Sequence, residues 1–133
     1  MCSYSLCLSS AAASSSSRFV WINEQMSWSE AQTYCRQHYT DLAIVRSTAE
    51  KQQIQDIMAN NGWIGLFRGS SSWSDGSSSS FTYWASGQPD NPSHHCVRTL
   101  RNGARWEDDG CTSRHPFFCH GGKLCVSVCI NTV

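Results

Sequence analysis

The sequence has few charged residues and no excess of either sign. Lysine and arginine total 10, aspartate and glutamate total 10, and charged residues make up 15% of the chain. Without a basic excess, the composition does not favour nucleic acid as a partner. The chain also lacks a run of about 18 apolar residues, so we expect no membrane-spanning helix.

Cysteine and tryptophan are abundant, with eight and six residues in a chain of 133. That much cysteine is rare in a reducing compartment unless it binds metal. The chain has no C-x-x-C motif and no histidine pair that follows a cysteine pair, so zinc spacing is missing. We therefore predict disulfides and a secreted, extracellular protein. Cross-links suit a domain of about 100 residues because they supplement a small core.

We divide the chain into a signal-like leader (1–17), one domain (18–120) and a C-terminal tail (121–133). The leader has a weakly apolar patch (6–8), followed by small residues that a signal peptidase accepts (11–13). It lacks the basic segment that usually opens such a signal. The alternative is a leader rich in serine and alanine that has no targeting role.

Two helices are predicted from capping boxes, in which a serine and a glutamate three residues later satisfy each other's backbone donors. Ser27 with Glu30 opens the first helix, and Ser47 with Glu50 opens the second. Short strands are expected at 19–22, 42–45, 63–66, 97–100, 104–106 and 117–119, with an Asn-Gly turn inside the hairpin 97–106. Two helices with later short strands and long loops predict an α+β domain.

An ordered set of short motifs between Phe19 and Cys119 resembles the C-type lectin-like domain. The motifs are, in chain order, Trp28-Ser29-Glu30-Ala31, Cys35, Trp63-Ile64-Gly65-Leu66, Trp73-Ser74-Asp75-Gly76, Trp84, Gly87, Gln88-Pro89-Asp90, Cys96, Trp106, Cys111 and Cys119. Each motif alone is weak, but the ordered set is specific. The resemblance implies the C-type lectin-like fold, with two helices, small antiparallel sheets and a long loop region.

The resemblance also implies two disulfides, Cys35–Cys119 and Cys96–Cys111. Arithmetic alone leaves 15 pairings for the six cysteines outside the leader. Cys125 and Cys129 in the tail stay unassigned. They could pair with each other, link two chains into a dimer, or remain free.

In sugar-binding members of this family, a calcium ion bridges the protein and two sugar hydroxyls. Calcium takes six to eight oxygen ligands. The resemblance implies that Gln88, Asp90, Glu107 and Asp108 are metal ligands, that these four and His94 contact carbohydrate, and that Pro89 follows a cis peptide bond. The order Gln-Pro-Asp resembles the galactose-type triplet of the family.

Two positions depart from the family's pattern. His94 stands where a glutamate is usual, and imidazole is a poor ligand for a hard cation. Glu107 stands where an asparagine is usual, which adds a carboxylate. In addition, no Trp, Tyr or Phe lies between Asp90 and Cys96 to stack on a sugar.

Each candidate also has a plainer interpretation. The triplet could be only a loop corner, Asp108 and Asp109 could be a solvated acidic turn, and His94 and His95 could be solvated loop residues. Three arginines of the predicted hairpin, Arg98, Arg101 and Arg105, are most simply its exposed face.

The leading hypothesis is a secreted, calcium-dependent lectin that binds glycans or glycoproteins, such as those of microbes in innate immunity. The alternative is a metal-independent domain of the same fold that binds a protein ligand. An enzyme is not expected. His94, His95, Cys96 and Asp90 could suggest a thiol nucleophile or a zinc site, but a disulfide at Cys96 would remove both.

Overall fold

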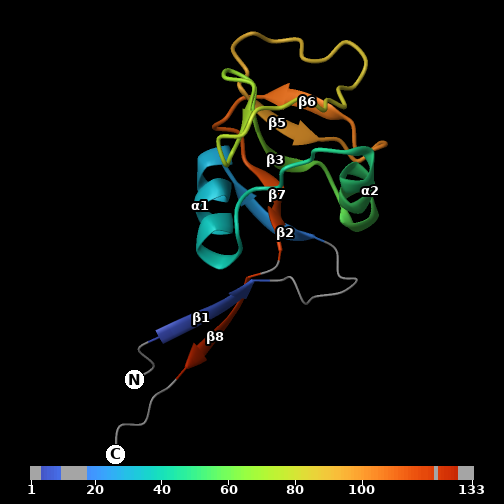
Figure 1. Cartoon of the computed structure of the whole chain (residues 1–133). Helices are drawn as coiled ribbons and strands as arrows, with labels where there is room; N and C mark the ends of the chain where they lie inside the picture. Colours follow the sequence, from blue (N-terminus) through green and yellow to red (C-terminus); the bar gives the residue numbers. More distant parts are fainter. Residues whose placement is uncertain (1–3, 10–17, 122, 129–133) are drawn as a thin grey trace, which may run out of the picture.

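The computed structural model describes residues 4–9, 18–121 and 123–128. In chain order its elements are β1 (Tyr4–Ser9), β2 (Phe19–Met26), α1 (Trp28–His38), α2 (Thr48–Ile57), β3 (Gly62–Phe67), β4 (Ser72–Trp73), β5 (Cys96–Thr99), β6 (Trp106–Asp109), β7 (His115–His120) and β8 (Lys123–Val128). The main sheet has the order β2-β7-β3-β5-β6, and β4 pairs with β3. The predicted α+β class is confirmed. In Figure 1, α1 and α2 lie on either side of the sheet, and the long loop lies beyond β5 and β6.

Both helices begin where their serines predict. Ser27 Oγ accepts a hydrogen bond from the Glu30 backbone N–H at 3.3 Å, and the Glu30 carboxylate accepts one from the Ser27 N–H at 3.3 Å. Ser47 Oγ likewise accepts from the Glu50 N–H at 3.2 Å. These contacts satisfy donors that a helix start leaves unpaired.

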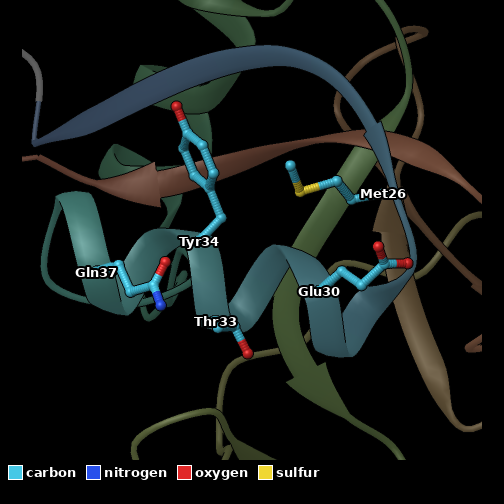
Figure 2. Close-up of a pocket in the computed structure, with 5 residues that line it drawn as sticks. All are labelled: Met26, Glu30, Thr33, Tyr34 and Gln37. Atoms are coloured by element: carbon cyan, nitrogen blue, oxygen red, sulfur yellow. The ribbon is translucent and has the colours of Figure 1, made fainter.

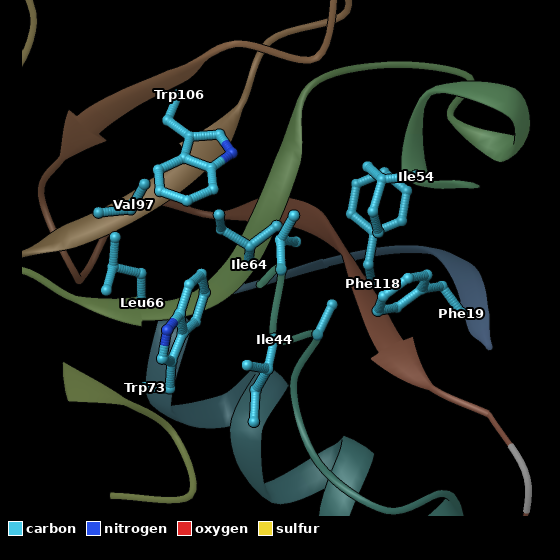
Figure 3. Packing of buried hydrophobic residues seen from close by; sticks show 11 residues of the cluster. Phe19, Ile44, Ile54, Ile64, Leu66, Trp73, Val97, Trp106 and Phe118 are labelled. Atoms are coloured by element: carbon cyan, nitrogen blue, oxygen red, sulfur yellow. The ribbon is translucent and has the colours of Figure 1, made fainter. Parts of the chain in front are cut away.

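The apolar core continues directly beneath the loop region. Trp106 of β6 is 1% exposed. The rings of Trp73, Phe81 and Trp84 each meet it close to edge-on, at centroid distances between 5.7 and 5.9 Å. Figure 3 shows Trp106 and Trp73 packed with the aliphatic side chains of β3 and β5. Because Trp106 is fixed by the core, the acidic residues that follow it start from a rigid position.

The two disulfides implied by the resemblance are present. Cys35 of α1 is bonded to Cys119 of β7, with 5.4 Å between the Cα atoms. Cys96 at the start of β5 is bonded to Cys111, just after β6, with 5.1 Å between the Cα atoms. The first crosslink ties a helix to the sheet, and the second ties the two ends of the β5–β6 region.

The strand predicted at residues 42–45 is wrong, although all four residues are buried. Only an isolated bridge joins Leu42 to Cys119. The Ala43 N–H donates to the Phe118 carbonyl at 2.9 Å, and the Ala43 carbonyl accepts from the Gly65 N–H at 2.7 Å. The segment thus runs between β7 and β3 and is joined to each of them by isolated hydrogen bonds. Its apolar sequence reflects this burial and does not indicate a regular ladder of β-sheet hydrogen bonds.

The hairpin turn is longer than predicted. Gly103 and Ala104 both have positive φ, at 75° and 55°, and the Leu100 N–H donates to the Arg105 carbonyl at 2.7 Å. β6 therefore begins only at Trp106 and extends to Asp109. The strand expected at 104–106 lies two residues too early because a buried alanine, not only the glycine, takes the left-handed conformation.

The leader and the tail contribute one strand each. β1 and β8 pair antiparallel as a separate two-stranded sheet, on the side of the domain away from the long loop (Figure 1). In this register Cys7 stands opposite Cys125. The small residues 11–13 and Cys129 lie outside the described residues. The predicted signal and the predicted dimer therefore stay predictions.

Candidate functional site

The loop before β5 is attached to β6 by backbone contacts. The Trp106 N–H donates to the Tyr83 carbonyl at 2.8 Å, and the Ala85 N–H donates to the Trp106 carbonyl at 2.8 Å. A tight turn follows, in which the Gln88 N–H donates to the Ala85 carbonyl at 3.0 Å and Gly87 has φ 79°. This φ favours glycine. The next peptide bond, Gln88–Pro89, is cis, as the resemblance implies.

Asp108 brings the loop and β6 together. Its side chain is 0% exposed. The carboxylate accepts hydrogen bonds from the backbone N–H groups of Asp90 and Asn91, both at 3.1 Å. It also forms an ion pair with Arg68, with Nη1 to Oδ2 at 3.0 Å. The segments that carry the predicted ligands therefore meet at one buried carboxylate, and its charge is balanced by an arginine.

Glu107 lies in a second polar cluster. Successive side chains of a strand point to opposite faces, so Glu107 shares a face with Asp109 and not with Asp108. On that face Arg98, its partner in the β5–β6 register, forms an ion pair with Glu107. Arg98 also approaches Asp109, with Nε to Oδ2 at 3.6 Å. The structure thus separates Glu107 from the contacts that Asp108 makes.

Asp109 is held ionised by its neighbours. Burial raises the pKa of this carboxyl, but hydrogen bonds from His115 and from the Gly110 N–H, together with the Arg98 charge, outweigh burial and lower the pKa overall. His115 Nε2 lies 2.6 Å from Asp109 Oδ2. Because a carboxylate only accepts, that nitrogen carries the proton. Asp109 therefore serves to join β6 and β7.

The remaining predicted residues lie along the loop. Gln88 is partly buried, and its Oε1 is enclosed with no hydrogen-bond partner. Asp90 is exposed. His94 is partly buried, with Nε2 at 3.3 Å from Asn91 Nδ2. The loop thus carries an enclosed, unpaired amide oxygen at Gln88 and an exposed carboxylate at Asp90, two residues apart.

The described donors do not fit a calcium ion in this arrangement. A calcium site needs several oxygens around one point. Both Asp108 oxygens already accept hydrogen bonds, and Glu107 is paired with Arg98. Among residues 18–121, no three His, Cys, Asp or Glu side chains gather as a metal would require. Of the four predicted metal ligands, Glu107 and Asp108 are paired with arginines, whereas Gln88 and Asp90 are not.

Sequence reasoning did not identify Arg68 and assigned Arg98 to an exposed face. Arg68 directly follows β3, and its side chain is 21% exposed. Arg98 is 22% exposed, with acidic partners on β6. The signal that could have found Arg98 is cross-strand pairing, which places it opposite Glu107. No local pattern could have found Arg68, because its partner lies 40 residues away.

A shallow hollow of about 280 Å³ lies elsewhere, along α1 and the end of β2. Figure 2 shows its lining residues, Met26, Glu30, Thr33, Tyr34 and Gln37. None of them belongs to the predicted site. Within the described part of the chain, no helix is long and apolar enough to span a membrane.

Comparison with known proteins identifies the family. The model of the lectin C-type domain matches residues 24–121. The chain belongs to the C-type lectin domain family. Proteoglycan 3 of Mus musculus is 35% identical over 114 residues, covering 78% of this chain and 51% of that protein. Lectin BRA-3 of Megabalanus rosa is 31% identical over 105 residues, covering 71% of this chain and 65% of that protein.

A solved structure supports the same fold. Human lithostathine superposes with a TM-score of 0.73 at 23% identity, covering 86% of this chain and 95% of that one. At this identity the likeness shows the fold alone. The chain spans about half the length of the mouse proteoglycan that it matches. The predicted C-type lectin-like fold is confirmed. The enzyme alternative at Cys96 is excluded because that sulfur is bonded to Cys111.

Proposed function

We propose that this C-type lectin domain is an extracellular recognition module that binds carbohydrate at the loop from Gln88 to His94. The observation that carries the proposal is the enclosed Oε1 of Gln88, which has no hydrogen-bond partner. Buried polar atoms are rarely left unpaired, and exceptions are often functional. Gln88 is only partly buried and its neighbours Gly87 and Pro89 are exposed, so a change of its side-chain rotamer on binding would bring this oxygen to a sugar hydroxyl.

The neighbouring groups suit a polyhydroxylated ligand. The exposed Asp90 carboxylate follows the cis peptide and can accept from a second hydroxyl. His94 lies on the same loop and can donate or accept. Asp108 keeps the backbone of Asp90 and Asn91 in place, so the two acceptors are presented on a loop that needs little ordering on binding.

Calcium dependence and galactose selectivity stay predictions of the sequence. The Gln-Pro-Asp order supports a galactose-type ligand, but Glu107 and Asp108 are paired with arginines, so calcium is not part of the binding chemistry proposed here. The paired carboxylates also favour the second candidate, a metal-independent domain that binds a protein ligand. Secretion and extracellular location are supported by the two disulfides, which persist in oxidising compartments.

The test is a glycan array followed by calorimetric titration with galactose- and mannose-terminated sugars, each in calcium and in EGTA. We expect a glycan signal, and Gln88→Ala should weaken it about tenfold because one hydrogen bond of roughly 1.5 kcal/mol is lost. Gln53→Ala is the matched control, since Gln53 Oε1 is also enclosed and unpaired but lies on α2.

Three outcomes separate the candidates. Binding that Gln88→Ala reduces and Gln53→Ala leaves intact supports the proposal. Binding that EGTA abolishes would restore the calcium prediction. A folded protein with no glycan signal in either condition would refute carbohydrate binding and leave the protein-ligand candidate.

A further inference from the structure

We propose that Arg68 does in this chain what a bound cation would do at the same place. Its guanidinium neutralises Asp108, and Asp108 then holds the loop backbone that follows the cis peptide bond. The recognition loop is thus set in position without metal. The inference rests on the proposed function only in taking this loop as the ligand site.

The contacts of Arg68 hold both ends of the segment from Asp90 to His95. Its backbone N–H donates to the His95 carbonyl at 2.7 Å. Its side chain reaches Asp108 at 3.0 Å, and Asp108 accepts the N–H groups of Asp90 and Asn91. Arg68 therefore positions Asp90 and Asn91 through its side chain and Asp108. It positions His95 through its own backbone N–H.

The negative charge of Asp108 is already balanced by its neighbours. Asp108 is fully enclosed, and one guanidinium and two backbone N–H donors surround its carboxylate. Hydrogen bonds to an ionised group are about twice as strong as neutral ones. A calcium ion at Asp108 would have to displace Arg68, for which Asp108 is the one ion-pair partner among the described residues. That displacement would leave the largely enclosed Arg68 side chain unpaired, which is costly.

The first test is the thermal midpoint of the wild-type chain in millimolar calcium and in EGTA. We expect the same midpoint in both. A ligand that binds only the folded state at 100 times its Kd stabilises it by about 2.7 kcal/mol, so calcium binding would be plainly visible. A midpoint that rises with calcium would overturn the proposal.

The second test is amide hydrogen exchange of Asp90 and Asn91, measured by NMR in EGTA. In Arg68→Gln we expect these two amides to exchange about tenfold faster or more, because the carboxylate that holds them loses its counter-charge. Arg46→Gln is the matched control, since Arg46 also pairs with an aspartate, Asp75, but on the surface. Its Asp90 and Asn91 amides should exchange at the wild-type rate.

Unchanged exchange at both amides in Arg68→Gln would contradict the role given to Arg68. Should that variant fail to fold, the thermal midpoint of the wild-type chain in calcium and in EGTA still tests the proposal. Neither readout involves a sugar. A chain that ignores calcium but binds no glycan would therefore refute the proposed function and leave this inference standing.

Discussion

Two regions of this domain are held together by different forces. Around α1, β2 and β7 the contacts are apolar, with Trp28, Ala31 and Cys35 buried on one face of the helix. Around the loop before β5 and along β6, the contacts are ion pairs and backbone hydrogen bonds that converge on acidic side chains. The structure of the first region can be predicted from hydrophobic periodicity, whereas the structure of the second depends on which charged residues the fold brings into contact. Ligand-binding residues are expected in the second, because loops on a rigid scaffold carry function.

The largest measurable difference between the two regions is expected when their disulfides are removed. Replacing Cys35 and Cys119 with alanine opens a crosslink that spans 84 residues, and replacing Cys96 and Cys111 opens one that spans 15. Loop-closure entropy predicts a loss of about 4–5 kcal/mol for the first pair and about 3 kcal/mol for the second. Urea unfolding of the two double variants measures both. Equal losses would contradict the loop-closure argument, in which the crosslink that spans more residues stabilises the fold more.

The two regions should also respond to acid in different pH ranges. Burial lowers the pKa of His120 below its usual 6.5, and Arg46 adds to this, while the carboxylates of Glu50, Asp41 and Asp75 oppose it. The ring accepts a hydrogen bond from the Ile44 N–H at 2.9 Å, which requires the neutral form.

Because the unfolded chain protonates this histidine first, stability should fall as pH drops below about 6.5, by at most about 1.4 kcal/mol per pH unit. The contribution of Asp109, whose pKa is lowered from 3.8, should be fully present above about pH 3.8 and be lost as the pH falls from there through the lowered value. Urea midpoints across this range test both statements. His120→Gln should flatten the decline near pH 6, since glutamine can accept the same bond without titrating.

The smallest effect is expected for an exposed ion pair. Arg46 and Asp75 lie 3.0 Å apart with side chains 52% and 37% exposed. Such pairs contribute about 0–1 kcal/mol. Arg46→Gln should therefore shift the urea midpoint only slightly. A loss comparable to that of a disulfide would mean that the turn at Asp75 carries more of the fold than its exposure implies.

Much of the first region was predictable. Ser27 and Ser47 mark both helix starts because capping is a local interaction. The motif Trp63-Ile64-Gly65-Leu66 predicts β3, and the cysteine pairing followed from the resemblance. The segment 42–45 was mistaken for a strand because burial on both sides produces the same apolar run.

The second region was predictable only in outline. The sequence indicated which segments carry the candidate ligands, and the structure brings Asp90 and Asp108 together. It could not indicate that Glu107 would pair with Arg98, nor that Arg68 would reach Asp108. These partners are distant along the chain, and ion pairing produces no periodic pattern in the sequence.

By itself, the sequence determined the helices, the family and the crosslinks, since these depend on local patterns and on an ordered set of motifs. Only the tertiary structure decided which charge neutralises Asp108. The physical reason is that an enclosed carboxylate needs a counter-charge, and whether that charge is a metal or an arginine depends on which side chains the fold brings within about 3 Å.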